Sequence, residues 1–587
     1  MSIDPIDILG ARVTAALVSA FGADFADVDP ALRRSEHADY QCNVALALKK
    51  RVPGNPRETA AKIAAALEVA DVCELPIEIA GPGFLNLKLR SDFLAAQVQK
   101  QTRDERLGAL LTGRPETIVI DYSAPNIAKE MHVGHLRSSI IGDALARTLE
   151  FVGNNVIRQN HLGDWGTPFG MLIEHLIDLG GDLEKGGDSN VSDLGAFYRS
   201  ARAKFDAEPT FAERSRSRVV LLQAGDEQTL SLWRRIVEQS HLHFNAVYQK
   251  LGVGLTREHA AGESLFNPML AGVVAELEAK GITSVDQGAL CVFPPGFKGK
   301  DGGPFPLIVR KSDGGYGYAA TDLAAIKYRF QTLKADRAIY VVGSPQAQHL
   351  SMIYKVAEMA GWLAPPQVAK HVGFGSVLGE DGKILKSRAG EALSLLDLLC
   401  EADERALATV KEKNAERRDD PLAPEDEPKV AHAIGMAAIK YADLSSDRVK
   451  DYVFAWDRML AANGNTGPYL QYAHARTCSI IKKSRETRAG LAANQIAIVT
   501  PEERALALAL LAFPRTIHDV ATSLEPHRLC GYLFDLASMF SSFFAACPVL
   551  KADSAAERAS RLALCDVTAR VMKQGLGLLG IEAPERM

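Results

Sequence analysis

The sequence predicts three successive units: a small α+β domain, an α/β domain built on a parallel sheet, and an all-α helical bundle. Three observations predict this order. Strand and helix patterns alternate after residue 117, residues 416–428 (ERRDDPLAPEDEP) have the composition of a linker, and the remaining chain is rich in Ala and Leu at helical spacing. A length of 587 residues suits roughly three to five domains. We expect the units to span 1–112, 113–400 and 401–587.

The N-terminal unit combines helix patterns with two short strand patterns. Apolar residues recur at helical spacing from Ile6 to Phe21, and a second helix pattern runs from Glu58 to Val69. Pro76–Ala80 and Phe84–Leu89 have the alternation and the flanking glycines of two strands. Gly113–Pro115 is a typical boundary, because glycine and proline interrupt regular structure.

The central unit has the βαβ pattern of a Rossmann-like parallel sheet. Thr117–Asp121 predicts a strand, Leu136–Val152 a helix with one apolar face, and Asn155–Gln159 the next strand. Such a sheet places its site at the carboxyl ends of the strands. Residues from about 171 to 260 are polar and helix-patterned, which predicts a helical insertion. Further strand patterns follow at Leu307–Arg310, Ala338–Val342 and His371–Gly375.

Composition excludes several classes of protein. Apolar residues make up 47% and charged residues 24%, which are globular values that exclude collagen, general disorder and a coiled-coil rod. A net charge of −5 argues against coating nucleic acid by bulk charge, although it allows a local basic groove. The eight Cys form no C-x-x-C pair, so neither a disulfide framework nor a zinc knuckle is expected. With no signal-peptide pattern and no long apolar span, we expect a soluble cytoplasmic protein.

A first motif lies between the first strand and the first helix of the central unit, in Ser123–His135 (SAPNIAKEMHVGH). His132 and His135 flank a glycine at the start of the helix, where backbone N–H groups and the helix dipole favour an anion. Gly134 has no Cβ, so a base or a phosphate can approach the backbone. Lys129 adds a cation. The pattern predicts imidazoles that donate to phosphate oxygens in a transition state, the alternative being two structural histidines.

A second motif is the segment 380–390 (EDGKILKSRAG), which has glycines near both ends and carries Lys383, Lys386 and Arg388. Glycines at both ends suit a mobile loop. Lysines on such a loop would stabilise the charge of a leaving pyrophosphate. A solvated surface turn is the alternative for this segment taken alone.

Together the two motifs resemble the paired signature motifs of class I aminoacyl-tRNA synthetases. His132-Val133-Gly134-His135 matches the His-Ile-Gly-His element, and Lys383–Ser387 matches Lys-Met-Ser-Lys-Ser with Leu385 in place of the usual serine. Other blocks resemble the arginyl-tRNA synthetase family over nearly the whole chain: 160–167 (NHLGDWGT), 262–264 (GES), 318–322 (YAATD) and 465–472 (NTGPYLQY).

The resemblance implies that the chain joins L-arginine to its tRNA through an adenylate, with ATP and Mg²⁺ and without protein-bound zinc. It implies that tRNA is needed for the first step. It implies catalytic charge stabilisation by Lys129, His132, His135, Lys383 and Lys386, and ATP binding by Pro125, His132, Gly134, His135, Lys383 and Lys386. Which of Lys129 and Lys383 carries the pyrophosphate charge stays open.

For arginine, the resemblance implies binding by Ser123, Asn126, Glu263, Tyr318, Asp322 and Gln346. Carboxylates and neutral acceptors suit a guanidinium, because its five N–H donors must all find partners. Lysine would leave buried polar groups unpaired, the case in which selectivity reaches about 10⁴ or more. Such discrimination fits a chain in which we find no separate editing domain. Taken singly, each of these residues could instead be structural.

The expected RNA contacts lie in two regions. Residues 474–488 carry five basic residues against one acidic residue, which predicts a basic stripe for phosphates. The resemblance places this helix in an anticodon-binding domain and Phe84 and Asn86 at the D-loop of the tRNA. The residues expected to bind tRNA are Phe84, Asn86, Tyr469, Tyr472, Arg476, Lys482 and Lys483, with the aromatic rings stacking on bases. The expected partners are tRNA, arginine and ATP, with no membrane, and the chain is expected to be a monomer.

Two other functions stay open on the sequence alone. A related nucleotidyl transferase could use the same histidine motif to join a small carboxylic acid to an amine, and would need no helical C-terminal third. A non-catalytic relative would bind tRNA but form no adenylate.

Overall fold

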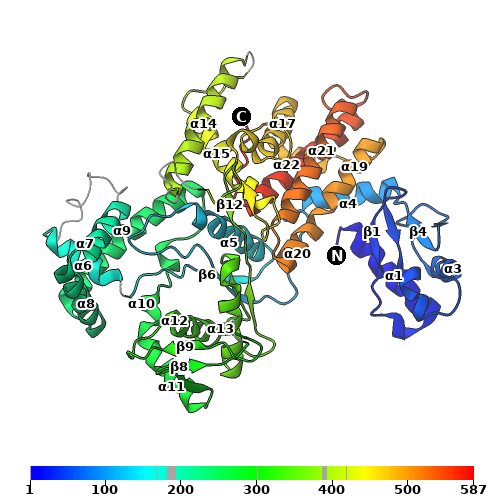
Figure 1. The fold of residues 1–587 in the computed structure, drawn as a ribbon. Helices are drawn as coiled ribbons and strands as arrows, with labels where there is room; N and C mark the ends of the chain where they lie inside the picture. The colour runs from blue at the N-terminus through cyan, green and yellow to red at the C-terminus, as the bar shows by residue number, and fades with distance from the viewer. Residues whose placement is uncertain (1, 167, 181–193, 300–301, 386–392, 418–419) are drawn as a thin grey trace.

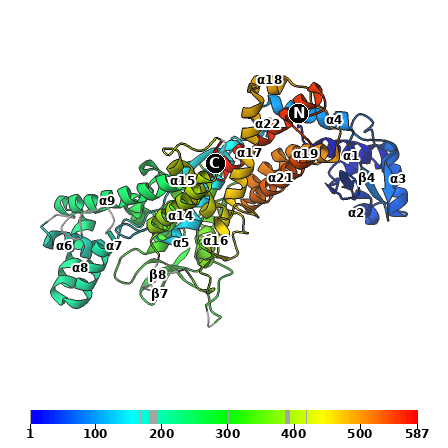
Figure 2. The ribbon, with the colours of Figure 1, turned by 90° about the horizontal axis from the view of Figure 1, so that it is seen from above.

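The computed structural model describes residues 2–166, 168–180, 194–299, 302–385, 393–417 and 420–587. Figures 1 and 2 show an elongated molecule. The N-terminal unit, in blue, lies at one end and the helical insertion, in teal, at the other, with the C-terminal helices between them. The predicted order of a small α+β unit, a parallel-sheet α/β unit and a helical bundle is confirmed.

The N-terminal unit is a four-stranded antiparallel sheet covered by helices. Its strands are β1 (Leu32–Arg34), β2 (Tyr40–Cys42), β3 (Glu78–Ala80) and β4 (Phe84–Leu87), in the order β1-β2-β4-β3. The helices are α1 (Pro5–Phe21), α2 (Val44–Ala47) and α3 (Pro56–Ala66). Helix α1 begins where the side chain of Asp4 accepts from the N–H of Ile6 at 2.8 Å, with a proline in its first turn. The two predicted strands are present, although shorter, and β1 and β2 were not predicted.

Helix α4 (Ser91–Arg103) joins this unit to the C-terminal helices rather than to the central sheet, as Figure 1 shows. Gln101 donates to the carbonyl of Leu510 at 2.8 Å. Arg504 donates through Nε to Asp39 at 3.0 Å and also contacts the carbonyl of Leu89. Buried polar contacts therefore fix the N-terminal unit to the bundle.

The central sheet is parallel, as the βαβ pattern predicted. Its order is β11-β10-β5-β6, from β5 (Thr117–Asp121), β6 (Asn155–Gln159), β10 (Arg337–Tyr340) and β11 (Val368–His371). Helix α5 (Val133–Phe151) connects β5 to β6 and includes almost all of the predicted helix. In the register, Ile120 lies opposite Ile339 on one side and Arg158 on the other. The carboxyl ends of four strands thus meet at one edge.

The strand pattern at 307–310 belongs to a different sheet. Strand β9 (Leu307–Arg310) pairs antiparallel with β8 (Ala289–Val292), which pairs with β7 (Thr283–Asp286). Strand β11 ends at His371, where the sequence pattern began. The helices that accompany these strands are α10 (Glu263–Phe266), α11 (Leu270–Ala279), α12 (Tyr318–Lys327) and α13 (Ala347–Met359).

The helical insertion is formed by α6 (Pro168–Asp178), α7 (Leu194–Ala207), α8 (Pro209–Ala224) and α9 (Glu227–Leu251). Its last helix returns the chain to the sheet, because Tyr248 on α9 lies beside the loop that follows β5. The insertion therefore contributes side chains to the edge of the sheet where a site is expected.

The C-terminal third is a helical bundle, with one short strand. Its helices are α14 (Leu395–Ala415), α15 (Glu427–Leu444), α16 (Trp456–Met459), α17 (Gly467–Ser484), α18 (Arg488–Ala493), α19 (Pro501–Leu511), α20 (Phe513–Ser523), α21 (His527–Ala546) and α22 (Ala555–Leu578). Strand β13 (Tyr452–Val453) pairs with β12 (Val377–Leu378). Among the described residues, only α21 is long and apolar enough to span a membrane, and it packs against α19, α20 and α22.

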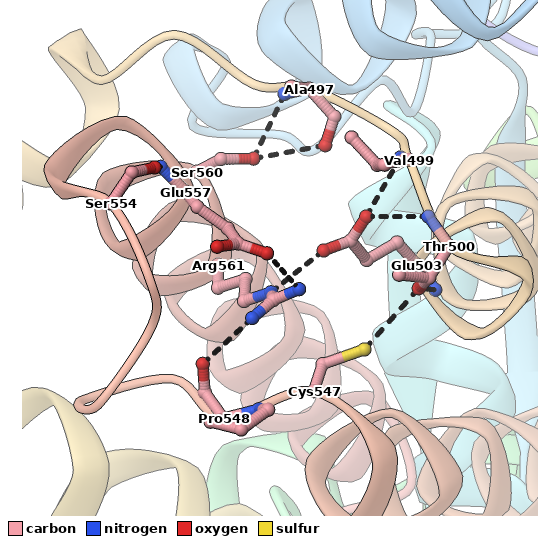
Figure 3. A network of polar contacts seen from close by, with 10 residues as sticks. All are labelled: Ala497, Val499, Thr500, Glu503, Cys547, Pro548, Ser554, Glu557, Ser560 and Arg561. Atoms are coloured by element: carbon pink, nitrogen blue, oxygen red, sulfur yellow. Dashed lines mark hydrogen bonds and ion pairs between the residues drawn. The ribbon is translucent and has the colours of Figure 1, made fainter.

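A polar network connects helices α19 and α22 of the bundle (Figure 3). Arg561 on α22 is buried and donates to Glu503 on α19 at 2.8 Å and to the carbonyl of Pro548 at 3.0 Å. The other oxygen of Glu503 accepts from the N–H of Thr500 at 3.0 Å, which completes the capping of α19. One carboxylate thus caps one helix and ties it to another.

A buried ion pair joins α5 to the bundle. Arg137 on α5 donates to Asp443 on α15 at 3.0 Å and to the carbonyl of Lys450 at 2.9 Å. Both side chains are at most 1% exposed, and Tyr452 stacks 5.3 Å from the guanidinium. Burial raises the pKa of Asp443 to about 6, and the charge of Arg137 opposes this rise. The helix that carries the histidine motif is therefore fixed directly to the C-terminal unit.

Candidate functional site

The two histidines form the amino end of α5. The ring of His132 accepts from the N–H of Gly134 through Nδ1 at 3.0 Å, and the ring of His135 accepts from the N–H of His132 through Nδ1 at 3.1 Å. Because both Nδ1 atoms are acceptors, each neutral ring carries its hydrogen on Nε2. A Cβ on Gly134 would lie 2.7 Å from the ring of His132, so this glycine is required for the arrangement.

Both rings are uncharged at neutral pH. Burial, together with the neighbouring His132, lowers the pKa of His135 to about 3. Burial and then the charge of Lys129 lower the pKa of His132. The ring centroids lie 4.0 Å apart. The pair can therefore present two neutral Nε2–H donors to one group of oxygens, without adding positive charge.

Lys129 is held by the helical insertion. Its ammonium lies 4.8 Å from the centre of the Tyr198 ring on α7, a cation–π distance. The side chain of Lys129 is exposed. Tyr198 could not be identified from the sequence, because the contact joins residues that are far apart in the chain. The ring thus contacts a cation whose charge acts on His132.

The chain that follows the second motif contacts the first motif. Lys383 is exposed in a turn in which its carbonyl accepts from the N–H of Gly379 at 2.8 Å. Beyond it, Lys386 and Arg388 lie outside the described residues. The chain then returns to the start of α5, where the N–H of Val133 donates to Leu393 at 3.1 Å and that of Leu395 to Met131 at 2.8 Å. The residues that directly follow the lysine segment, 393–395, thus lie beside the histidine pair.

Three loops pair with one another at the carboxyl ends of β5 and β6. The N–H of Gly163 donates to Pro125 at 3.2 Å, and the N–H of Glu263 donates to Leu162 at 3.0 Å. Asn126 is exposed and lies against Gly163, where a Cβ would approach its Oδ1 to 2.2 Å. The motifs around 126, 163 and 263, which are separate in the sequence, are adjacent in space.

The loop after β5 has unusual backbone geometry. Ser123, Ala124 and Ala128 have φ values of 76°, 50° and 58°, a region that residues with a side chain rarely adopt. Such residues persist only where the surroundings fix them, and they cluster at functional sites. Here the N–H of Ala124 donates to Asn160 at 2.9 Å and that of Ala128 to Ser240 at 2.9 Å.

Ser123 lies beneath this loop. Its hydroxyl is 2.8 Å from the hydroxyl of Tyr248 and accepts from Ser139 at 3.0 Å, and the residue is 3% exposed. Tyr248 also accepts from Asn160 at 2.9 Å. Pro125 is buried as well. Of the predicted arginine-binding and ATP-binding residues, Ser123 and Pro125 thus support the loop rather than stand at its surface.

Acidic groups gather opposite this loop. Glu263 is the first residue of α10, and Asp164 accepts from both the N–H and the hydroxyl of Ser264, at 2.8 and 2.6 Å. Burial, together with the charges of Asp164 and Asp322, raises the pKa of Glu263 to about 7. A carboxyl group with a pKa near neutrality at this place is suited to receiving a cation.

Tyr318 and Asp322 lie one turn apart on α12. Tyr318 is 78% exposed, and Asp322 is half-buried. Asp322 Oδ2 lies 2.6 Å from His349 Nε2 on α13. Gln346 is exposed three residues before this histidine, at the end of a 3₁₀ turn (Ser344–Gln346). The structure therefore brings Asp322 beside the segment that carries Gln346, and adds His349, which the sequence analysis missed.

A groove of about 840 Å³ lies in the C-terminal unit. Arg476 lies 5.0 Å from the ring centre of Tyr472 and 5.7 Å from that of Phe544. Lys482 pairs with Asp420 at 3.1 Å. The lining includes two acids, Asp420 and Glu585, and several apolar side chains. Aromatic and basic side chains and the end of the chain also line the groove: Tyr472, Arg476, Lys482, Lys483, Phe544, Lys551, Arg586 and Met587. Tyr469 is half-buried beside Phe534, with their ring centres 5.8 Å apart.

In the N-terminal unit, the two predicted residues differ in exposure. Phe84 on β4 is partly exposed. Asn86 is 6% exposed, accepts from Gln41 at 3.0 Å and donates to Glu78 at 3.0 Å. The amide of Asn86 is thus used within the sheet. Nowhere in the described ranges do three or more His, Cys, Asp or Glu side chains form a group that could hold a metal ion.

Three family models match the chain. The model described as tRNA synthetases class I (R), catalytic domain, matches residues 97–456. The DALR anticodon binding domain matches residues 470–587, and the arginyl tRNA synthetase N terminal domain matches residues 7–89.

Individual proteins match over the same length. The chain is 55% identical to an arginine–tRNA ligase from Thermobifida fusca over 584 residues, covering 100% of both chains. It is 46% identical to one from Laribacter hongkongensis over 581 residues, covering 99% of both. Among solved structures, arginyl-tRNA synthetase from Plasmodium falciparum has a TM-score of 0.84 at 28% identity and covers 100% of both chains. That from Thermus thermophilus has a TM-score of 0.82 at 26% identity, covering 99% of this chain and 100% of the other.

Proposed function

This chain belongs to the arginyl-tRNA synthetase family of class I aminoacyl-tRNA synthetases, and we propose which of its residues carry out each part of the reaction. The enzyme charges tRNA with arginine in two steps. The arginine carboxylate attacks the α-phosphorus of ATP, which forms arginyl-adenylate and releases pyrophosphate. The terminal ribose hydroxyl of the tRNA then attacks the adenylate carbonyl and releases AMP. The return of the chain, directly after the second motif, to the start of α5 supports our assignment.

We assign charge stabilisation to the histidine pair and the lysines. His132 and His135 donate their Nε2–H groups to phosphate oxygens, because both Nδ1 atoms are occupied by the helix cap. Lys129, Lys383 and Lys386 neutralise the leaving pyrophosphate, and ATP enters with Mg²⁺ as its counter-ion. Positioning and charge stabilisation account for most of the rate in such transfers, so no covalent nucleophile is needed. Gly134 contacts the nucleotide, and the buried Pro125 supports the loop that binds it.

We assign the arginine pocket to the acidic edge of the sheet. Asp322, with Tyr318 and Gln346, takes the guanidinium. Asn126 and Glu263 take the α-amino end, and Ser123 holds the loop between them. The raised pKa of Glu263 supports this assignment, because a carboxyl group with acidic neighbours gains most from an arriving cation. Lysine cannot satisfy as many acceptors as a guanidinium, which supports selection against it.

For tRNA, we propose three units with separate tasks. Residues 113–400 hold the chemistry, residues 401–587 hold the anticodon stem and loop, and residues 1–112 contact the D-loop. The groove beside α17 would receive anticodon bases, with Tyr472 as a stacking ring and Arg476, Lys482 and Lys483 as phosphate contacts. Tyr469, on the same helix but outside the lining of the groove, would be a second stacking ring. In the N-terminal unit, Phe84 would contact the D-loop, and Asn86 would support this contact through its bonds within the sheet. We further propose a cytoplasmic monomer.

ATP–pyrophosphate exchange tests the assigned substrate. With tRNA present, we expect exchange with arginine, and only background exchange with lysine or with citrulline, the uncharged analogue. Without tRNA, exchange with arginine should be near background. Exchange supported equally by lysine would contradict the arginine pocket, and strong exchange without tRNA would contradict the requirement for RNA in the first step.

The basic groove gives a separate prediction. Replacing both Lys482 and Lys483 by Ala should raise the KM for tRNA several-fold and reduce the dependence of this KM on salt, because fewer counter-ions are released on binding. The KM for arginine should not change. Aminoacylation measured at several salt concentrations checks this result. Lys280→Ala, at the end of α11 at the opposite side of Figure 1, is the matched control, and an equal effect of that change would argue against the groove.

A further inference from the structure

The pair formed by Asp322 and His349 is a feature that the assigned mechanism does not use. The side chains come from two helices that pack together, α12 and α13. The Oδ2–Nε2 distance is 2.6 Å, which is short and typical of a charge-assisted hydrogen bond. The side chains are 28% and 31% exposed, so a substrate can reach both. One oxygen of the carboxylate assigned to the guanidinium is thus already bonded.

The surroundings of this pair are acidic. Burial raises the pKa of Glu263 on α10, Tyr340 on β10 and Tyr354 on α13, and the charge of Asp322 adds to each rise. The hydrogen bond with Asp322 raises the pKa of His349, its charge adds to this rise, and burial opposes it. Asp322 is thus the charged group that raises the pKa of His349. The histidine therefore favours its cationic form beside Asp322.

Bound arginine would bring a second cation to the same carboxylate. Two positive groups on one carboxylate repel each other, whereas a neutral imidazole can still donate its Nε2–H to Asp322. The proton on Nδ1 can leave for the buffer without breaking that bond. The guanidinium then replaces the histidine as the cationic partner of Asp322, while the hydrogen bond from the histidine keeps the carboxylate in the same orientation.

We propose that His349 is a positioning residue that holds the Asp322 carboxylate for the guanidinium and loses one proton to solvent when arginine binds. This inference rests on the assigned role of Asp322. It gives arginine binding a definite pH dependence. The guanidinium lowers the pKa of His349 from its raised value, so between the two values the affinity for arginine increases with pH, by up to tenfold per pH unit. Above that window, the affinity no longer depends on this group.

Calorimetric titration of the full-length protein with L-arginine tests the proposal. Runs in buffers of different ionisation enthalpy, between about pH 6 and pH 8, count the protons released on binding. His349→Gln retains an N–H near the position of Nε2 but cannot become a cation. We expect the wild type to release up to about one proton more than this variant at the pH of maximal release. We also expect the affinity of the variant to depend less on pH.

Glu263, whose pKa is raised to about 7, is also expected to release a proton when arginine binds. The titration is therefore repeated in a variant that lacks this carboxyl group. In Glu263→Gln, the remaining release should be that of His349, and adding His349→Gln should remove it. His518→Gln, on the exposed face of α20, is the control and should leave the proton count unchanged. Equal proton counts in the wild type and His349→Gln would overturn the proposal.

The result also separates this inference from the assigned pocket. If Asp322→Asn binds arginine as tightly as the wild type, the pocket assignment has failed. If Asp322→Asn weakens binding but His349→Gln changes neither the proton count nor the pH dependence, the pocket stands and the role of His349 fails. Thermal unfolding of each variant shows whether a loss of binding reflects a loss of folding.

Discussion

His135→Asn is expected to lower the rate of arginyl-adenylate formation by about 10²–10³-fold, with little change in the affinity for ATP. The amide oxygen of Asn can replace Nδ1 as the acceptor for the N–H of His132, so the helix start is retained. The variant has no counterpart of Nε2–H, the donor assigned to the phosphate oxygens. Loss of one such donor typically costs this factor in a transition state. Single-turnover measurement of adenylate formation in the presence of tRNA checks the effect.

A comparison with alanine separates chemistry from folding. His135→Ala loses both the donor and the cap, so it should add a loss of roughly 1 kcal/mol in stability that Asn avoids. His132→Asn should behave like His135→Asn. His37→Asn, an exposed histidine of the N-terminal unit, is the control and should leave the rate unchanged. Near-normal adenylate formation by both Asn variants would show that the histidine pair is structural.

Asp322→Asn should raise the KM for arginine by roughly 10- to 150-fold, which corresponds to losing a charge-assisted contact of about 1.5–3 kcal/mol. The change preserves the shape of the side chain and one acceptor oxygen, but it removes the charge that a guanidinium needs. The KM for ATP should not change, because the nucleotide is assigned to the opposite motif. Asp322→Ala should go further and abolish the preference for arginine over citrulline.

The matched control for this change lies a few residues earlier. Asp313 is exposed, and its Oδ1 accepts from the N–H of Gly315 at 2.9 Å, a bond that the amide oxygen of Asn can also accept. Asp313→Asn should therefore leave the KM for arginine unchanged. An unchanged KM in Asp322→Asn, in a protein that unfolds at the normal temperature, would remove this residue from the pocket.

Much of the fold could be predicted because its signals are local. The strands 117–121 and 155–159 and the helix between them have complete periodic patterns, and the structure contains all three. The acidic linker also separates α14 from α15 as expected. Short strands such as β1 and β13 escaped prediction, because two or three residues carry no periodicity. The partners of the strand at 307–310 are set by tertiary contacts, which no local pattern encodes.

The site was only partly accessible to sequence reasoning for the same reason. The motifs around His132, Lys383 and Asp322 could be identified from the chain alone, whereas His349, Tyr198 and Tyr248 gave no signal. These three approach their partners from other helices, and an isolated histidine or tyrosine is usually a core residue. Asn86 illustrates the opposite case, a residue that was expected to contact tRNA. Its amide instead bonds to side chains on the two neighbouring strands, which strand alternation cannot reveal.

The ion pair between Arg137 and Asp443 restricts how this enzyme can be rebuilt. Removing one partner of a buried pair costs about 3–5 kcal/mol, a large part of the roughly 5–15 kcal/mol that stabilises a typical domain. A catalytic fragment cut before α15 would leave a guanidinium without its counter-charge at the helix that presents the histidines. Chimeras that graft the helical bundle of another synthetase onto this chain must therefore bring an acid at position 443 with them.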